Sequence, residues 1–153
     1  MIRTDAELRR TKELLRQGAD HLSLKDKSLR DEGFSDDEVG RLLDPERAFR
    51  AQLVAEVEIY ERLKSGDVSD LRDIDVSDLG RVLIGLRIAS GLTQRELAER
   101  LGVHESLVSR DENNEYHGVS LERVTRILHA LHRGLRVVPC EAPASDSRNL
   151  TAV

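Results

Sequence analysis

Tryptophan is absent from this chain of 153 residues, and aromatic residues of all kinds make up only 3% of it. A single cysteine, Cys140, excludes an internal disulfide framework. No apolar run approaches the ~20 residues that are needed to cross a bilayer. The first residues also lack the apolar core and the small-residue cleavage site of a secretory signal. These absences predict a cytoplasmic protein without a membrane partner.

The sequence also lacks the motifs of the common enzyme classes. It contains no Gly-rich phosphate loop, no nucleophile elbow and no His-Glu-x-x-His pair. His129 and His132 could bind a metal together with Cys140 or His117, but these residues do not form a complete ligand set. We therefore expect no enzymatic activity, no metal and no cofactor.

Charged residues are abundant, at 35% of the chain, but they are unevenly distributed. Residues 1–77 carry 14 Arg and Lys against 19 Asp and Glu, a net charge of −5. Residues 78–138 carry 9 Arg against 8 acidic residues, a net charge of +1. A nearly neutral segment can bind a polyanion only with modest affinity that depends strongly on salt.

Hydrophobic residues make up 39% of the chain, which is enough for a core, and their spacing is helical in most segments. We expect an all-α protein in four parts. These parts are a charged helical region at 1–64, a linker rich in Ser, Asp and Gly at 65–77, a compact helical domain at 78–138 and a disordered tail at 139–153.

The charged region at 1–64 is expected to contain several helices. Its first helix should be interrupted near Gly18 and again at residues 31–33. Ser35 opens a capping box. Pro45 suits the first position of a further helix, with Asp44 as its cap.

That further helix carries an apolar row that approaches a heptad seam. The row consists of Phe49, Leu53, Val57, Tyr60 and Lys64. Two interpretations remain open, since so short a repeat fits an intramolecular helical hairpin as well as an interface between two copies.

The most informative segment is residues 91–112, GLTQRELAERLGVHESLVSRDE. Thr93 and Glu96 form a capping box at the start of a short helix, which carries an apolar strip from Leu97 to Leu101. Gly102 suits a left-handed residue at the end of that helix, and a second short helix follows around Val108. Two short helices joined by a tight turn are the arrangement that places one helix in the major groove of DNA.

Residues 86–112, LRIASGLTQRELAERLGVHESLVSRDE, closely resemble the Cro/lambda-repressor-like helix-turn-helix family, often called the Xre family. The resemblance covers about 78–133 and implies a lambda-repressor-like fold that binds double-stranded DNA. By position, it implies ten DNA-contacting residues: Thr93, Gln94, Arg95, His104, Glu105, Ser106, Leu107, Ser109, Arg110 and Asn113. The second helix would contact bases, with Arg110 suited to guanine O6 and N7, while Thr93, Gln94 and Asn113 would contact phosphates.

The resemblance also implies a structural pair, because Arg87 and Glu112 occupy positions at which the family has an ion pair between two helices. Asp111 departs from the family pattern, which usually has an apolar or aromatic residue there. His104 has an alternative role as the cap of its helix.

These features predict a sequence-specific DNA-binding transcription regulator. We expect a repressor that acts as a homodimer on a palindromic operator, with two modules ~34 Å apart. The junction EIYERLKSG at residues 58–66 and the charged helices before it also resemble HigA-type antitoxins. The alternative is therefore an antitoxin that neutralises a toxin protein through residues 1–77 and represses its own operon through the helix-turn-helix.

Overall fold

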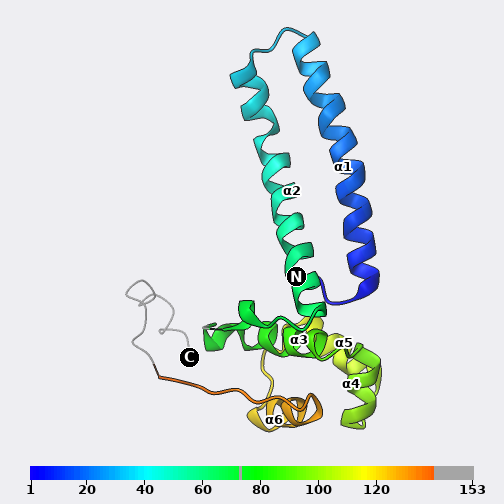
Figure 1. Cartoon of the computed structure of the whole chain (residues 1–153), viewed down its shortest axis with the longest axis vertical. Helices are drawn as coiled ribbons and strands as arrows, with labels where there is room; N and C mark the ends of the chain where they lie inside the picture. Colours follow the sequence, from blue (N-terminus) through cyan, green and yellow to red (C-terminus); the bar gives the residue numbers. More distant parts are fainter. Residues whose placement is uncertain (73, 140–153) are drawn as a thin grey trace.

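The computed structural model describes residues 1–72 and 74–139, and these residues form helices without any strand. Two long helices, α1 (Asp5–Asp31) and α2 (Asp36–Lys64), form an antiparallel hairpin that stands on a cluster of shorter helices (Figure 1). The cluster contains α3 (Leu79–Ala89), α4 (Gln94–Leu101), α5 (Glu105–Asn113) and α6 (Leu121–Ala130). The expected all-α class is confirmed. Apart from Pro139, the tail expected at 139–153 lies outside the described residues, as does Cys140.

The hairpin is held together by two rows of inward-facing residues whose spacing alternates between three and four. On α1 the row is half-buried and consists of Leu8, Thr11, Leu15, Gly18, Leu22, Lys25 and Leu29. On α2 the row is buried or half-buried and consists of Val39, Leu43, Glu46, Arg50, Leu53, Val57 and Tyr60. This alternation is the heptad spacing of coiled coils, and here it joins two helices of the same chain. The hairpin interpretation therefore describes most of this seam.

Both ends of the expected row lie outside this intramolecular seam. Phe49 is 57% exposed and Lys64 is exposed, while Arg50 takes the inward position next to Phe49. Each spacing of four moves a residue by about 40° around the helix, so the row from Phe49 through Leu53 to Val57 turns by about 80° about the axis. A row that starts at Arg50 stays on one side, so Phe49 is left on the outer surface of the hairpin.

Two expected interruptions are absent from the hairpin. Helix α1 continues through Gly18, and α2 runs from Asp36 to Lys64 with Pro45 inside it, so Asp44 caps no helix. A proline within a helix removes one backbone hydrogen bond. Pro45 and Arg41, four residues earlier, are both exposed, so water can satisfy the carbonyl that is left without a donor. The seam contacts on either side of Gly18 and of Pro45 outweigh the local tendency of these two residues to end a helix. The capping box at Ser35 is confirmed.

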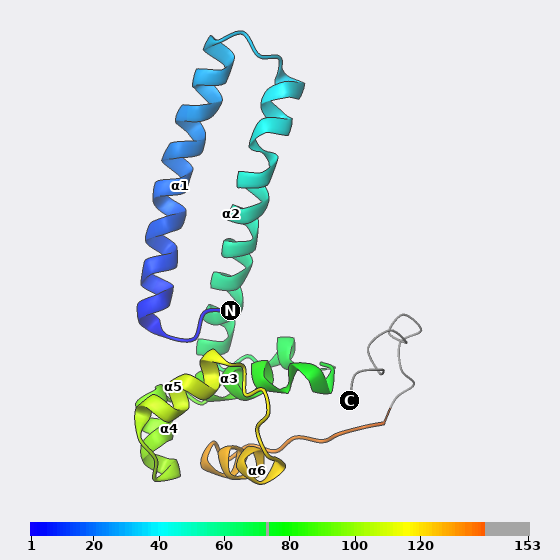
Figure 2. The ribbon, with the colours of Figure 1, turned by 180° about the vertical axis from the view of Figure 1, so that it is seen from behind.

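One hydrophobic core joins the base of the hairpin to the short helices. Seen from behind, the hairpin meets the short helices where α1 begins and α2 ends (Figure 2). Val57, Tyr60 and Leu63 of α2 belong to the same buried cluster as the apolar residues of α3 to α6, and Ile2 also lies in it. The other buried residues of this cluster are Val82, Leu83, Ile84, Leu86, Ile88, Leu97, Ala98, Leu101, Val108, Tyr116, Val124, Ile127 and Leu131. None of the helices in the described ranges has an apolar stretch able to cross a membrane.

The described parts of the segment at 65–77, residues 65–72 and 74–77, pack against α3. They contain two short 3-10 helices, η1 (Ser69–Leu71) and η2 (Val76–Asp78). The side chain of Leu71 lies directly over Gly85, where a Cβ would stand 2.7 Å from a Leu71 methyl carbon. Val68, Leu71 and Ile74 all pack against the core. The expected linker thus contributes apolar side chains to the base of the hairpin.

The loop that follows α5 approaches α3 closely at Gly80. A Cβ on Gly80 would lie 1.8 Å from the carbonyl oxygen of Glu115, which is far inside van der Waals contact. Glu115 and Tyr116 have positive φ values of 47° and 56°, and this conformation folds Tyr116 back into the core. Only glycine at position 80 allows this return of the chain.

We expect Gly80→Ala to lower the free energy of unfolding by about 1–3 kcal/mol, because the added methyl group must displace backbone atoms. Gly40→Ala is the matched control, since a Cβ there meets nothing within 4 Å and alanine is the better helix former. Urea unfolding followed by circular dichroism measures both changes. Equal stability of the two variants would contradict the close approach.

Candidate nucleic-acid interface

The α4–α5 pair has the helix-turn-helix geometry that its sequence predicts. The Thr93 hydroxyl accepts a hydrogen bond from the Glu96 amide at 3.1 Å, and the Glu96 carboxylate accepts one from the Thr93 amide at 2.7 Å. The bonds from the amide and the hydroxyl of Thr93 lower the pKa of Glu96 below its ordinary value. Gly102 follows α4 with a φ of 66°, in the left-handed region that favours glycine. The capping box and the glycine cap are therefore confirmed.

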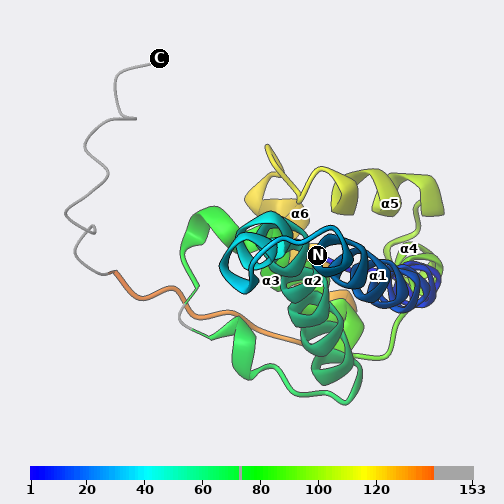
Figure 3. The same cartoon turned by 90° about the horizontal axis from the view of Figure 1, so that it is seen from above.

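Helix α5 turns a row of polar residues away from the core. Its own residues Val108 and Glu112 are buried on the inner side, and no other described helix covers its outer side (Figure 3). The outer residues are Glu105, Ser106, Arg110 and Asn113, which are exposed, with Leu107 and Ser109, which are half-buried. Within the described ranges, the Arg110 guanidinium forms no ion pair. It is therefore available to an external acceptor.

His104 caps the start of α5. Its Nδ1 accepts a hydrogen bond from the Ser106 amide at 3.2 Å and lies 2.9 Å from the Ser106 hydroxyl. The structure therefore places His104 in the capping position that was the alternative to a base contact. Both side chains remain exposed at the edge of the helix.

The side chains at the start of α4 have partners within the chain. The Thr93 hydroxyl also donates to Glu96 at 2.8 Å, and Gln94 donates to the Glu112 carboxylate at 2.8 Å. Arg95 is exposed and lies 3.2 Å from Glu99. Since Thr93 caps only the amide of residue 96, the amides of residues 94 and 95 remain as donors at the positive end of the helix dipole.

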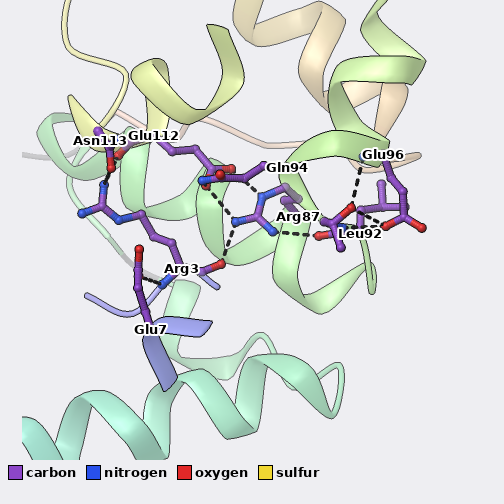
Figure 4. A network of polar contacts seen from close by, with 9 residues as sticks. Arg3, Glu7, Arg87, Leu92, Gln94, Glu96, Glu112 and Asn113 are labelled. Carbon is purple, nitrogen blue, oxygen red and sulfur yellow. Dashed lines mark hydrogen bonds and ion pairs between the residues drawn. The ribbon is translucent and has the colours of Figure 1, made fainter. Parts of the chain in front are cut away.

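The ion pair implied for Arg87 and Glu112 is present and buried at the centre of the module (Figure 4). The guanidinium is bidentate on the Glu112 carboxylate, with Nη2 at 2.8 Å from Oε2 and Nε donating to Oε1. Nη1 donates to the carbonyl of Leu92 at 2.7 Å, just before α4. Together with the bond from Gln94, these contacts connect α3, α4 and α5.

The segment before α1 joins the same network, which the sequence did not predict. Nη2 of Arg87 donates to the carbonyl oxygen of Arg3 at 3.0 Å. The Arg3 side chain reaches the end of α5, where Nη1 donates to the carbonyl of Glu112 at 2.7 Å and to Oδ1 of Asn113 at 2.9 Å. These residues are about 110 positions apart, so no local pattern could have indicated the contact.

Asp111, which departs from the family pattern, has a specific partner. Arg123 of α6 donates to Oδ2 of Asp111 from Nε at 2.9 Å and from Nη2 at 2.6 Å. Both side chains are about one-quarter exposed. An ion pair thus joins α5 to α6 at this position.

Tyr116 is a second residue that sequence reasoning missed. Its ring is buried beside the ion pair, and burial together with the charge of Glu112 raises its pKa. Within residues 1–72 and 74–139, no group of three or more His, Cys, Asp or Glu residues could hold a metal ion, and Cys140, one of the ligands considered beside His129 and His132, lies outside this part of the chain.

We expect Arg87→Ala and Glu112→Ala each to lower the free energy of unfolding by about 3–5 kcal/mol, because each leaves one charge buried without its partner. The double variant Arg87→Met/Glu112→Leu should lose far less than the sum of the two. Arg95→Ala serves as the control, since an exposed helical ion pair contributes only about 0.3–0.5 kcal/mol. Additive losses in the double variant, measured by urea unfolding, would argue against a coupled pair.

Comparison with known proteins gives one match. The family model described as "Helix-turn-helix domain" matches residues 78–138, the segment that contains α3 to α6. No curated protein and no solved structure matches the chain. The matched range includes the capped α4, the left-handed turn at Gly102 and the outward face of α5. Residues 78–138 are therefore a helix-turn-helix domain, and this domain indicates a DNA-binding regulator.

Proposed function

We propose that this protein is a sequence-specific transcription regulator of the cytoplasm, a repressor of the Xre type that binds a palindromic operator as a homodimer. The observation that carries the proposal is the outer face of α5, which is polar, uncovered and held at a set angle by the buried Arg87–Glu112 pair. A helix presented in this way can enter the major groove of DNA.

In this proposal α5 contacts the bases. Arg110 donates two parallel hydrogen bonds to guanine, a contact that contributes ~1–3 kcal/mol of discrimination. Ser106 and Ser109 add hydrogen bonds, Leu107 contacts a thymine methyl group, and Glu105 accepts from a cytosine amine. His104 orients the first turn of α5 as its cap.

Phosphate contacts in this proposal come from both ends of the motif. Arg95 and the free amides at the start of α4 supply donors on one side, and Asn113 supplies an amide on the other. Thr93 and Gln94 contribute by their place at the start of α4. Their side chains are engaged within the chain, since the Thr93 hydroxyl is bonded to Glu96 and one Gln94 amide hydrogen is bonded to Glu112. A near-neutral domain with these few contacts needs a second copy for strong binding.

The hairpin offers a surface for that second copy. An apolar groove of about 420 Å³ lies between α1 and α2, and its apolar lining is Leu14, Leu15, Leu22, Pro45, Phe49 and Leu53. Gly18 leaves space in the groove, and the exposed ring of Phe49 stands at its edge. A groove with a large apolar side chain beside it is suited to isologous pairing, in which Phe49 of each copy enters the groove of the other.

Neutralisation of a toxin is the alternative, and the acidic composition of residues 1–77 favours it. The hairpin (residues 5–64) and the segment 65–77 each have a net charge of −3, and the apolar groove of the hairpin could accept a segment of a basic protein in place of a second copy. The discriminating observation is a small basic protein encoded beside this gene that binds the full chain.

We expect Arg110→Ala to weaken binding to the selected operator by about 1–3 kcal/mol while leaving binding to random duplex DNA nearly unchanged. Arg95→Ala is the matched control, because loss of a phosphate contact weakens both by a similar factor. Binding-site selection with the purified protein supplies the operator, and fluorescence anisotropy measures both affinities. Equal losses for Arg110→Ala on the two DNAs would remove Arg110 from base recognition.

We also expect Phe49→Asp to convert the protein from a dimer to a monomer, because the charge cannot be desolvated in the apolar groove. Leu24→Asp is the control, since Leu24 is 70% exposed on α1 and lies outside the groove lining. Sedimentation velocity measures the mass of each. A monomeric wild-type chain would contradict self-association and leave the groove to a different protein.

A further inference from the structure

The segment before α1 lies across the carboxyl end of the DNA-facing helix α5. Ile2 is buried in the core, and the amide of Arg3 donates to the Glu7 carboxylate at 2.8 Å. The carbonyl of Arg3 accepts from Arg87, while its guanidinium donates to Glu112 and Asn113 (Figure 4). Arg3 is therefore held at its backbone and at its side chain.

Arg3 determines the orientation of the side-chain amide of Asn113. An arginine side chain has only hydrogen-bond donors, so the group of Asn113 that faces it must be the carbonyl oxygen, at 2.9 Å. The Asn113 nitrogen, Nδ2, is then directed away from Arg3, and it donates to no group in the described part of the chain. Asn113 is exposed, so both hydrogens of Nδ2 are open to an external acceptor.

The ligand that suits this arrangement is an acceptor with negative charge. The last carbonyls of α5 carry the negative end of the helix dipole, which by itself would repel an anion. The bond from Arg3 to the Glu112 carbonyl covers one of these carbonyls and adds a full positive charge beside Asn113. A phosphate oxygen of the DNA backbone accepts hydrogen bonds without donating any. It therefore matches the Asn113 side chain, in which only the donor group, Nδ2, is free.

We infer that Arg3 is a positioning residue of the DNA interface. It orients the Asn113 amide toward a backbone phosphate next to the carboxyl end of α5, and it supplies positive charge at that phosphate. This inference rests on the proposed binding of DNA by α5. It adds to the interface a residue from outside the helix-turn-helix domain, far from it in the sequence.

Random-sequence duplex DNA is the right ligand for the test, because every duplex has the same phosphates. The affinity of the full chain is measured by fluorescence anisotropy at several KCl concentrations. We expect Arg3→Ala to weaken binding roughly tenfold, as for loss of a charge-assisted hydrogen bond. The slope of log K against log salt should also fall by about one.

The matched control is Arg41→Ala, which removes one positive charge from an exposed position of α2 near the far end of the hairpin. It should leave the affinity and the salt slope unchanged. A purely structural role for Arg3 would lower the melting temperature without changing the salt slope of the folded protein. An unchanged affinity and slope in folded Arg3→Ala would overturn the inference.

Orientation of the amide is tested by combining Arg3→Ala with Asn113→Ala. Asn113→Ala alone should weaken binding about as much as Arg3→Ala, and the double variant should lose much less than the product of the two factors. Fully multiplicative losses would overturn the orienting role. Asn113 is exposed, so Asn113→Ala keeps the fold even if Arg3→Ala does not, and an unchanged affinity in Asn113→Ala would also overturn it. A wild-type chain that binds no duplex DNA would refute the proposed function itself, and the inference with it.

Discussion

The buried ion pair between Arg87 and Glu112 is the interaction on which the arrangement of the module depends. Both side chains are almost entirely removed from solvent, so each charge is tolerated only while the other is in place. The pair recruits further donors and acceptors from Arg3, Leu92 and Gln94. Because these groups come from α3, α4, α5 and the segment before α1, one cluster sets the angle of α5.

The hairpin is connected to this cluster by a short path. Tyr60 of α2 donates from its hydroxyl to Asp5 at 2.9 Å, and this bond, with one from Lys64, lowers the pKa of the Asp5 carboxyl. Asp5 begins α1 and lies two residues after Arg3. A shared core and this run of polar contacts attach the hairpin firmly to α5. A second copy or a partner held by the hairpin would therefore lie in a defined position relative to α5.

Local patterns accounted for the parts of the fold that local chemistry controls. The capping boxes at Ser35 and Thr93 and the left-handed Gly102 follow from side chains that bond to neighbouring amides or lack a Cβ. The prediction of the Arg87–Glu112 pair came from the family resemblance, because the spacing of the two residues alone does not reveal it. Where local preference and packing compete, as at Pro45, packing along the heptad seam prevailed.

The sequence by itself determined that the protein is helical and has a capped two-helix motif with an outward polar face around Arg110. These features depend on residues within one or two helical turns of each other. Only the tertiary structure decided that Phe49 stays outside the seam, that Gly80 admits the Glu115 carbonyl, that Asp111 pairs with Arg123, and that Arg3 reaches Asn113. Each of these depends on which distant segments the core brings together, and that follows from the burial of apolar surface over the whole chain.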